Sequence, residues 1–451
     1  MPANLFDDDG SYSGKRFSLG ICGQRDSELG EALNYMDNWE IVYLDAQEPL
    51  PAGGLDVIIA TQPETDIRVL KDAKPNLIRI GWISGRSAKW AKAPWLLDYD
   101  VIVAPRRAAD DLWRRSSVKC RVLPPSSRHA ARAKYLRSLL KECYSGYRIG
   151  IKCPAANKYA MKWGDYYFAQ ALRRAFQARG HLARVDLRPD WYDSRTSCDD
   201  VVIVLRGQVK YEPVSSQINL LWLISHPDAV CDEEFEKFDH VFVASESYAR
   251  TLASRLSVPV SQLLQCSDPE IFHPPAVDEE VGDAEIIFVG NTRGELRQVV
   301  ANAIAKNLPV SIFGRGWKKF LPPEQIAGSH IPNRMLHKYY GLAKIVLNDH
   351  WPDMERAGFI SNRIFDVALC GGFIISKNFQ GSEAFGGDLI TYRSAEELGE
   401  LCRKWLNADN ERKRVGDRLR QRVLAAHTFS HRTASLIDVI AKLQKHRSTP
   451  Q

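Results

Sequence analysis

Short apolar runs alternate with longer amphipathic stretches along almost the whole chain. The apolar runs carry hydrophobic residues at consecutive positions, so both of their faces would be buried in a folded protein. Helical patterns, such as residues 167–181 and 247–256, lie between several of them. Strands buried on both faces and separated by helices are typical of parallel sheets covered by helices, so we expect an α/β fold. The predicted strands are residues 16–22, 56–61, 77–83, 100–105, 147–153, 200–205, 218–224, 240–245, 285–290, 309–314, 344–349, 373–376 and 388–393.

The bulk composition indicates a globular protein with more than one domain. A chain of 451 residues is too long for a single core, and its 45% hydrophobic and 26% charged residues show no disordered or fibrous bias. The net charge of +6 is small, and no long run of Lys or Arg occurs, so we expect no nucleic-acid partner. The acidic N-terminus is no signal peptide, and no run approaches about 18 apolar residues. We expect a cytoplasmic protein, and peripheral attachment to the inner face of a membrane stays open.

The nine cysteines are scattered and form no CxxC pair. Several lie within apolar runs, which indicates buried, reduced thiols. The sequence therefore predicts neither a disulfide framework nor a zinc site.

An internal repeat divides the first two thirds of the chain. Residues 82–104 align without gaps on residues 222–244, and each copy has a Trp-bearing strand followed by a strand that ends in Ala. We interpret this as a duplicated α/β domain, although two unrelated segments with similar strand chemistry would also fit. The first copy lacks the long polar loops of the second, so we expect it to be an accessory domain. Whether the protein forms a homo-oligomer through this domain is left open. The predicted domains are residues 1–146 (accessory, a degenerate copy of the next), 147–280, 281–428, and a closing helix and tail at 429–451.

A glycine-containing loop follows the first strand of the third domain. Ligands of open parallel sheets bind at the carboxyl ends of the strands. Gly290 ends the strand, and Asn291, Thr292 and Arg293 precede a helix whose first N–H groups could receive an anion. A plain strand–turn–helix with a solvated arginine is the alternative.

A second loop of the same domain places an arginine between two glycines. Gly314, Arg315 and Gly316 follow the strand at 309–314. A guanidinium at a strand end suits a phosphate or a nucleobase edge, although a glycine-rich turn with a solvated arginine explains the pattern equally well.

A charged pair stands at the start of an otherwise apolar helix. Ser361 is a good N-cap and is followed by Asn362 and Arg363, with Asp366 about one turn further on. Arginine opposes the helix dipole at this position, and an anion bound at the helix start would resolve that conflict. Asp366 could then accept hydrogen bonds from vicinal hydroxyls. A local ion pair between Arg363 and Asp366 is the alternative.

The middle domain offers polar residues after two of its strands. Gly164 and Asp165 follow a loop rich in Lys, Tyr and Trp, and His226 follows the strand at 218–224. The histidine could contact substrate or cap the next helix. No Ser-His-Asp order, Walker A loop, HExxH motif or convincing metal spacing is present, so we expect no metal and no cofactor.

Several of these segments together resemble the CgeB-like, spore-maturation-type glycosyltransferases, which are related to glycosyltransferase family 4. The resemblance covers about residues 148–440 and is most specific from 340 to 376. The segments that carry it are 222–228, 238–249, 263–274, 288–291, 312–317, 344–351, 358–376, 381–398 and 427–432.

This resemblance implies a GT-B fold, with two Rossmann-like domains facing a cleft, here preceded by an extra Rossmann-like domain. It places Asp366 where an acid holds the ribose hydroxyls of the donor. The family 4 pattern has a second acid further upstream, which would fall at Gly358, and Glu355 is the nearest acid present.

The implied activity is transfer of a sugar from a nucleotide-sugar donor to a glycan or lipid-linked acceptor, in bacterial surface polysaccharide or glycoconjugate synthesis. The resemblance implies retention of the anomeric configuration, whereas His226 as a general base would allow inversion. With no DxD-type motif, arginines are expected to replace a metal at the leaving diphosphate. A nucleotide-sugar epimerase or hydrolase, or an inactive glycan-binding or assembly protein, remains the alternative.

The candidate residues fall into three groups. The catalytic candidates are His226, Arg293, Arg315 and Arg363. The donor-binding candidates are Gly290, Asn291, Gly314, Arg315, Gly316, Asn348, Gly358, Phe359, Ser361, Asn362, Arg363 and Asp366. The acceptor-binding candidates are Lys162, Trp163, Gly164, Asp165 and His226.

Overall fold

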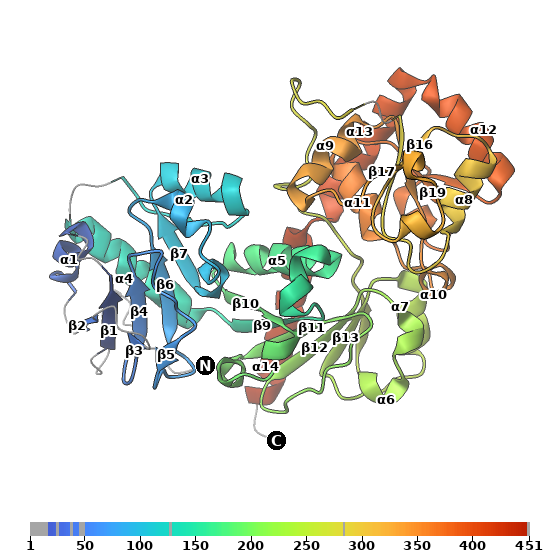
Figure 1. The fold of residues 1–451 in the computed structure, drawn as a ribbon. Coiled ribbons are helices and arrows are strands. Elements are labelled where there is room, and N and C mark those ends of the chain that lie inside the picture. The colour runs from blue at the N-terminus through green and yellow to red at the C-terminus, as the bar shows by residue number, and fades with distance from the viewer. Residues whose placement is uncertain are drawn as a thin grey trace. The chain divides into compact units, whose positions relative to one another are not determined.

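A computed structural model of the chain contains three six-stranded α/β sheets (Figure 1). Backbone contacts divide the chain into two compact units. One unit comprises residues 1–152 and 173–202, and the other comprises residues 153–172 and 203–451. The structure describes residues 17–23, 27–36, 39–44, 50–125, 129–282 and 285–448.

The first two sheets share one strand order. In each of these sheets, the strand that comes second along the chain lies at one edge, beside the strand that comes first. The other four strands follow in chain order on the far side of that first strand. The first sheet has the order β2-β1-β4-β6-β7-β8, with β1 Phe17–Cys22, β2 Trp39–Leu44, β4 Val57–Ala60, β6 Ile78–Trp82, β7 Val101–Ala104 and β8 Arg121–Val122. The second has the order β10-β9-β11-β12-β13-β14, with β9 Arg148–Cys153, β10 Leu182–Leu187, β11 Val201–Arg206, β12 Ile218–Leu223, β13 His240–Val243 and β14 Val260–Gln262. The strands β3 Leu50–Pro51 and β5 Leu70–Lys71 form a separate pair.

The third sheet has the doubly wound order β17-β16-β15-β18-β19-β20. Its strand pairs are parallel, and the strand order reverses between β15 and β18, where ligands of such folds bind. The strands are β15 Ile286–Val289, β16 Val310–Phe313, β17 Ile326–Gly328, β18 Ile345–Asn348, β19 Ile374–Lys377 and β20 Ile390–Tyr392. The α/β prediction is confirmed, and each predicted strand has its counterpart within a few residues.

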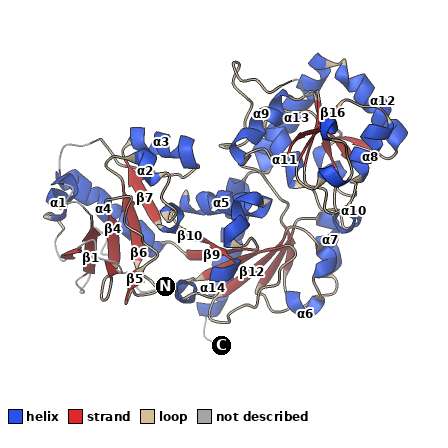
Figure 2. Cartoon of the chain, in the orientation of Figure 1, coloured by secondary structure: helices blue, strands red, loops and turns tan. Residues whose placement is uncertain are grey.

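Helices accompany the strands of each sheet (Figure 2). None of those in the described ranges is long and apolar enough to cross a membrane. The α-helices are α1 Ser27–Leu33, α2 Ser87–Trp90, α3 Arg106–Ser116, α4 His129–Ser145, α5 Gly164–Gln177, α6 Asp232–Phe235, α7 Glu246–Ala253, α8 Gln298–Ala305, α9 Leu336–Leu342, α10 Pro352–Arg356, α11 Asn362–Leu369, α12 Ala395–Leu406, α13 Asp409–Ala426 and α14 Phe429–Ser448.

The third sheet is buried on both faces, as its continuous apolar strands require. Ile287 and Val346 belong to one cluster of buried side chains, whereas Ile286 and Ile345 belong to another. Neighbouring residues of a strand point to opposite faces, so the two clusters lie on opposite sides of the sheet. Helix α11 contributes to the first cluster and is buried from Ile364 to Leu369.

Two glycines end α11 and fix its approach to the sheet. Gly371 has φ of 69°, a left-handed conformation that favours glycine after a helix end. At Gly372 an added Cβ would overlap the carbonyl oxygen of Tyr340, so α11 and α9 can approach closely only without a side chain there. The start of α11 is thereby held beside the carboxyl ends of β15 and β18.

Candidate active site

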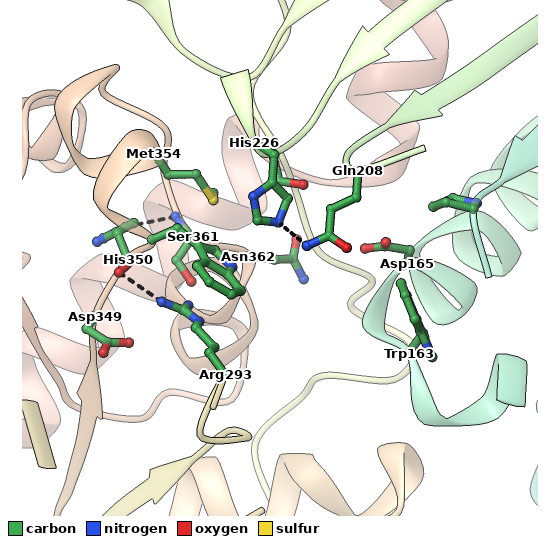
Figure 3. A pocket seen from close by; sticks show the side chains of 13 residues that line it. Trp163, Asp165, Gln208, His226, Arg293, Asp349, His350, Met354, Ser361 and Asn362 are labelled. Atoms are coloured by element: carbon green, nitrogen blue, oxygen red, sulfur yellow. Dashed lines mark hydrogen bonds between the residues drawn. The ribbon is translucent and has the colours of Figure 1, made fainter. Parts of the chain in front are cut away.

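A pocket of about 340 Å³ lies within the unit formed by residues 153–172 and 203–451 (Figure 3). It brings together the loop after β9, the loops after β11 and β12, the loop after β15, and the segment between β18 and α11. The residues that line it are Pro154, Trp163, Asp165, Gln208, Ser225, His226, Arg293, Asp349, His350, Trp351, Met354, Ser361 and Asn362. The structure thus gathers six residues that the sequence predicted, namely Trp163, Asp165, His226, Arg293, Ser361 and Asn362.

Arg293 is the cation of the pocket wall. Its backbone is left-handed, with φ of 61°, and its guanidinium lies 3.8 Å from the centre of the Trp351 ring. One Nη donates a 3.0 Å hydrogen bond to the carbonyl oxygen of His350. Burial, and then the nearby charge of Arg363, lower the pKa of Arg293 to about 10, so it stays charged at neutral pH. The packing therefore presents a positive charge in a fixed orientation.

His350 connects the end of β18 to the start of α11. Its Nε2 accepts a 3.1 Å hydrogen bond from the backbone N–H of Ser361, so the proton of the neutral ring lies on Nδ1. Burial lowers the pKa of His350 to about 3, and four surrounding cations act in the same direction. The ring is therefore a neutral support for the helix start and no proton donor at physiological pH.

Arg363 does not face the pocket, contrary to the prediction. Its two Nη atoms donate to Asn348 Oδ1 at 2.7 Å and to the carbonyl oxygen of Val289 at 2.5 Å. The guanidinium thereby bridges the carboxyl ends of β18 and β15, the point at which the strand order reverses. Asn348 has no exposed surface and donates in turn to Ser376 Oγ at 2.9 Å. The partly buried Arg363 and the buried Asn348 thus lie outside the pocket lining and support the strand ends beneath it.

Arg297, which the sequence reasoning missed, belongs to the same cluster. It is buried, forms an ion pair with Asp349, and also donates to the carbonyl oxygen of Asn291 at 3.2 Å. Together with Arg293 and Arg363 it places three guanidinium groups at this edge of the sheet. Among the described residues, only the carboxylate of Asp349 forms an ion pair with one of these three guanidinium groups. The edge therefore carries excess positive charge.

Asp366 lies behind the pocket wall. It is 8% exposed, and its carboxylate accepts hydrogen bonds from Ser267 Oγ at 2.6 Å and Asn362 Nδ2 at 3.0 Å. The alternative of a local ion pair with Arg363 is wrong, because the arginine is directed to the strand ends. Burial raises the pKa of Asp366 to about 7, which outweighs the hydrogen bonds and the charge of Arg363.

The predicted glycine loops pack against each other. An added Cβ at Gly314 would overlap the carbonyl oxygen of Gly290, and one at Gly316 would lie 2.5 Å from Thr292 Oγ1. The backbone N–H of Arg315 donates to Asn291 Oδ1 at 2.9 Å, and its side chain is exposed outside the pocket. Close backbone packing accounts for these glycines without any ligand.

Gly358 and Phe359 also have structural roles. Gly358 has φ of 70°, and the preceding carbonyl oxygen of Ala357 accepts a 2.5 Å hydrogen bond from Ser245 Oγ. Phe359 has no exposed surface, and its ring centre lies 5.9 Å from that of Tyr248. This loop is therefore fastened to the strand–helix turn that precedes α7.

The loop after β9 and the start of α5 supply the other wall. The Trp163 side chain lines the pocket and is 41% exposed. Asp165 lies in the first turn of α5 and also lines the pocket, and burial raises its pKa to about 6. Lys162 and Gly164, predicted with them, are exposed and do not line it.

His226 forms part of the pocket between these two walls. Its backbone is left-handed, with φ of 55°, at the end of a strand where such strain often accompanies function. Its Nε2 lies 3.3 Å from Gln208 Nε2, and its Nδ1 lies 3.7 Å from Asp353 Oδ2. Burial lowers its pKa, although Asp353 acts in the opposite direction. The imidazole is therefore held between two partners.

Metal-binding geometry is absent from the described part of the chain. There, no three or more His, Cys, Asp or Glu side chains are grouped so that they could hold an ion.

Comparison with known proteins identifies the C-terminal part. Residues 293–438 match the family model described as glycosyl transferase-like. This segment is similar to that family. Its first matched residue is Arg293, and it includes α11 and the segment that follows β18.

One curated relative extends the similarity. Over 171 residues the chain is 25% identical to the spore protein CgeB of Bacillus subtilis strain 168, and the alignment covers 34% of this chain and 53% of CgeB. The chain thus spans about half the length of that relative. The predicted resemblance to the CgeB-like glycosyltransferases is confirmed.

Solved structures of similar fold share little sequence with the chain. Anabaena HepE in complex with UDP-glucose is 8% identical, with coverage of 66% of this chain and 100% of that one and a TM-score of 0.47. AviGT4, a glycosyltransferase involved in avilamycin A biosynthesis, is 14% identical, with coverage of 66% and 98% and a TM-score of 0.43.

Proposed function

We propose that the chain transfers a sugar from a nucleotide-sugar donor to a carbohydrate acceptor. The observation that carries the proposal is the excess positive charge at the carboxyl ends of β15 and β18. Arg293 reaches the pocket, Arg297 and Arg363 lie behind it, and no described carboxylate pairs with Arg293 or Arg363. Such an edge favours a ligand with more than one negative charge, such as a nucleoside diphosphate.

The start of α11 adds to this attraction. Ser361 and Asn362 line the pocket, and the Ser361 side chain makes no capping hydrogen bond to the helix. The first N–H groups of a helix are suited to phosphate oxygens. Negative charge grows on the leaving diphosphate as the sugar bond breaks, so cations and dipoles fixed beforehand stabilise the transition state.

The opposite wall suits the acceptor. An exposed indole beside a carboxylate offers an apolar face and a hydrogen-bond acceptor, as Trp163 and Asp165 do. The similarity to CgeB and the glycosyl transferase-like match of residues 293–438 support the same reaction class.

The finer features of the proposal follow the resemblance and the charge distribution. The guanidinium cluster would neutralise the diphosphate without a metal ion or other cofactor, and the acceptor would be a glycan or a lipid-linked sugar of a bacterial surface polysaccharide or glycoconjugate. The enzyme would work in the cytoplasm, with peripheral attachment to the membrane when the acceptor is lipid-linked. The N-terminal domain would serve assembly.

Calorimetry with UDP, GDP, dTDP, ADP and CMP tests the donor site. Replacing Arg293 by Ala should raise the dissociation constant of the nucleotide that binds most tightly by about 10- to 100-fold, because a hydrogen bond to a charged group is lost. Arg315→Ala is the matched control, since this arginine also follows a strand of the same sheet but lies outside the pocket, and it should change affinity by less than about 2-fold. Unchanged binding in Arg293→Ala, or no binding by the wild type, would contradict the proposed function.

A further inference from the structure

We infer that Trp351 is a positioning residue shared by two side chains of the pocket. Its ring directs the Arg293 guanidinium toward the donor without neutralising it, and it links that arginine to His226. This inference rests on the proposed function, which places the diphosphate at Arg293. The three side chains line one pocket but come from three separate loops, which follow β18, β15 and β12. The indole is the contact that the other two have in common.

The backbone fixes where the Trp351 ring can lie. Trp351 is the N-cap of α10, in an extended conformation with φ of −68° and ψ of 148°, and Pro352 follows it at the start of the helix. A proline at that position keeps the preceding residue out of the helical conformation. Helix α10 is held in turn by the buried side chain of Met354 and by the ion pair of Glu355 with Lys377 at 2.9 Å. The ring is therefore presented from a firmly anchored segment.

An aromatic ring can hold a cation without cancelling its charge. The central carbon of the Arg293 guanidinium lies 3.8 Å from the centre of the Trp351 ring, a distance at which a cation and a π face attract each other. Arg293 also donates a 3.0 Å hydrogen bond to the carbonyl oxygen of His350, drawn as a dashed line in Figure 3. Both partners are uncharged. A carboxylate in place of the ring would also hold the arginine but would offset its charge, so a diphosphate would gain less from it.

The same ring contacts His226. The two ring centres lie 4.9 Å apart, and the ring planes are inclined by 60°. Inclined aromatic rings with centres about 4.5–7 Å apart attract each other. His226 follows β12 of the second sheet, whereas Trp351 follows β18 of the third. The indole thereby joins a loop of the second sheet to the arginine at the edge of the third.

Further contacts hold α10 against the loops of the second sheet. Asp353, in the first turn of α10, has its Oδ2 3.7 Å from His226 Nδ1. At the other end of α10, the carbonyl oxygen of Ala357 accepts a 2.5 Å hydrogen bond from the buried Ser245 Oγ. A shift of these loops would therefore move the ring. By the reciprocity of coupled sites, a ligand on Arg293 would in turn be felt at His226.

Calorimetry with the nucleoside diphosphate that the wild type binds most tightly tests the action on Arg293. Trp351→Leu removes the π face and should raise the dissociation constant by about 3- to 30-fold. Trp351→Phe keeps a ring and should stay within about 3-fold of the wild type. Trp351→Glu should weaken binding at least as much as Trp351→Leu, because its carboxylate offsets the charge of Arg293.

Trp405→Leu is the matched control for these variants. Trp405 is also partly buried and has Lys404 Nζ 5.3 Å from its ring centre, but it lies outside the pocket. Its replacement should change the dissociation constant by less than about 2-fold. Urea unfolding checks that each variant is folded. Should Trp351→Leu fail to fold, the comparison of Trp351→Glu with Trp351→Phe tests the same point.

A double variant separates positioning from packing. If the ring acts through Arg293, Trp351→Leu should change the dissociation constant by less than about 2-fold when Arg293 has already been replaced by Ala. A general loss of packing would weaken binding by the same factor in both backgrounds. Equal factors would therefore overturn the assignment of Trp351 as a positioning residue for Arg293.

NMR of histidines isotopically labelled at Cε1 tests the link to His226, whose signal is identified by its absence in His226→Ala. Saturation with the same nucleoside diphosphate should shift this signal in the wild type and in Trp351→Phe. In Trp351→Leu at saturation, the shift should fall to less than about a third of the wild-type value. A full shift in Trp351→Leu would show that the ligand reaches His226 without the ring, and would overturn the link.

The outcomes distinguish this inference from the proposed function. If the wild type binds no nucleoside diphosphate, the proposed function fails and the inference fails with it. If the wild type binds one and Arg293→Ala weakens that binding while Trp351→Leu does not, the donor site stands and the role of Trp351 is refuted.

Discussion

Asp366 makes the stability of the protein depend on pH. Its folded-state pKa is about 7, against an ordinary value of 3.8, because burial disfavours the charged form. The folded protein therefore binds a proton that the unfolded chain has already released, so the contribution of Asp366 to stability is greatest at low pH and is lost as the pH rises from about 4 to 7. A pKa raised from 3.8 to about 7 corresponds to about 4 kcal/mol in all.

Asp366→Asn should remove this dependence. The new amide resembles the protonated acid, and its oxygen can still accept a hydrogen bond from Ser267 Oγ. Its NH₂ group can donate to Asn362 Oδ1 once the Asn362 amide has flipped, and this oxygen lacks a partner in the wild type. Between pH 5.5 and 8 the wild type should lose about 2 kcal/mol of the stability that Asp366 contributes. The variant should not lose it, so the difference in unfolding free energy between variant and wild type should shift by about 2 kcal/mol in favour of the variant.

Urea unfolding followed by tryptophan fluorescence at pH 5.5 and pH 8 measures this difference. Asp417→Asn is the control, because Asp417 is exposed on α13 of the same domain. The reasoning would be refuted if Asp366→Asn and the wild type lost the same stability between the two pH values. It would also be refuted if the control changed the slope as much as Asp366→Asn does.

Two further substitutions test the supports of the pocket. Gly358→Ala should lower the free energy of unfolding in urea by about 1–3 kcal/mol, because the backbone has φ of 70° and the new Cβ would lie 2.8 Å from the carbonyl oxygen of Gln380. Gly387→Ala is the control and should lower it less, because its backbone has φ of 82° but its Cβ would meet open space. Equal losses in the two variants would mean that the close contact is unimportant. Arg297→Met leaves the buried Asp349 without its ion-pair partner and should cost about 3–5 kcal/mol. The double variant with Asp349→Asn should recover part of that loss, and an unchanged loss would show that the ion pair is not its source.

Several site residues were predictable because their signals are local. A polar residue within a few positions after a buried strand lies near the carboxyl edge of a parallel sheet, and this rule found Arg293 and His226. The helix start at Ser361 followed from its capping residue and the apolar pattern behind it. The segment from Asp349 to Trp351 also follows a strand directly, and the same rule would have found it.

The missed and misplaced residues depended on contacts that are distant in the sequence. Arg293 and Arg315 both lie in loops that begin with a glycine at a strand end. Of the two, Arg293 reaches the pocket, because Trp351 and the His350 carbonyl hold its guanidinium there. Arg363 turns away from the helix start because Asn348 and the carbonyl oxygen of Val289 accept from it.

The sequence by itself determined the elements of this protein and their arrangement into parallel sheets. That information is local, since a run of apolar residues specifies a strand buried on both faces wherever it occurs. Only the tertiary structure decided which polar side chains share the pocket. They come from separate loops, and burial, ion pairs and carbonyl acceptors from distant segments fix the direction of each.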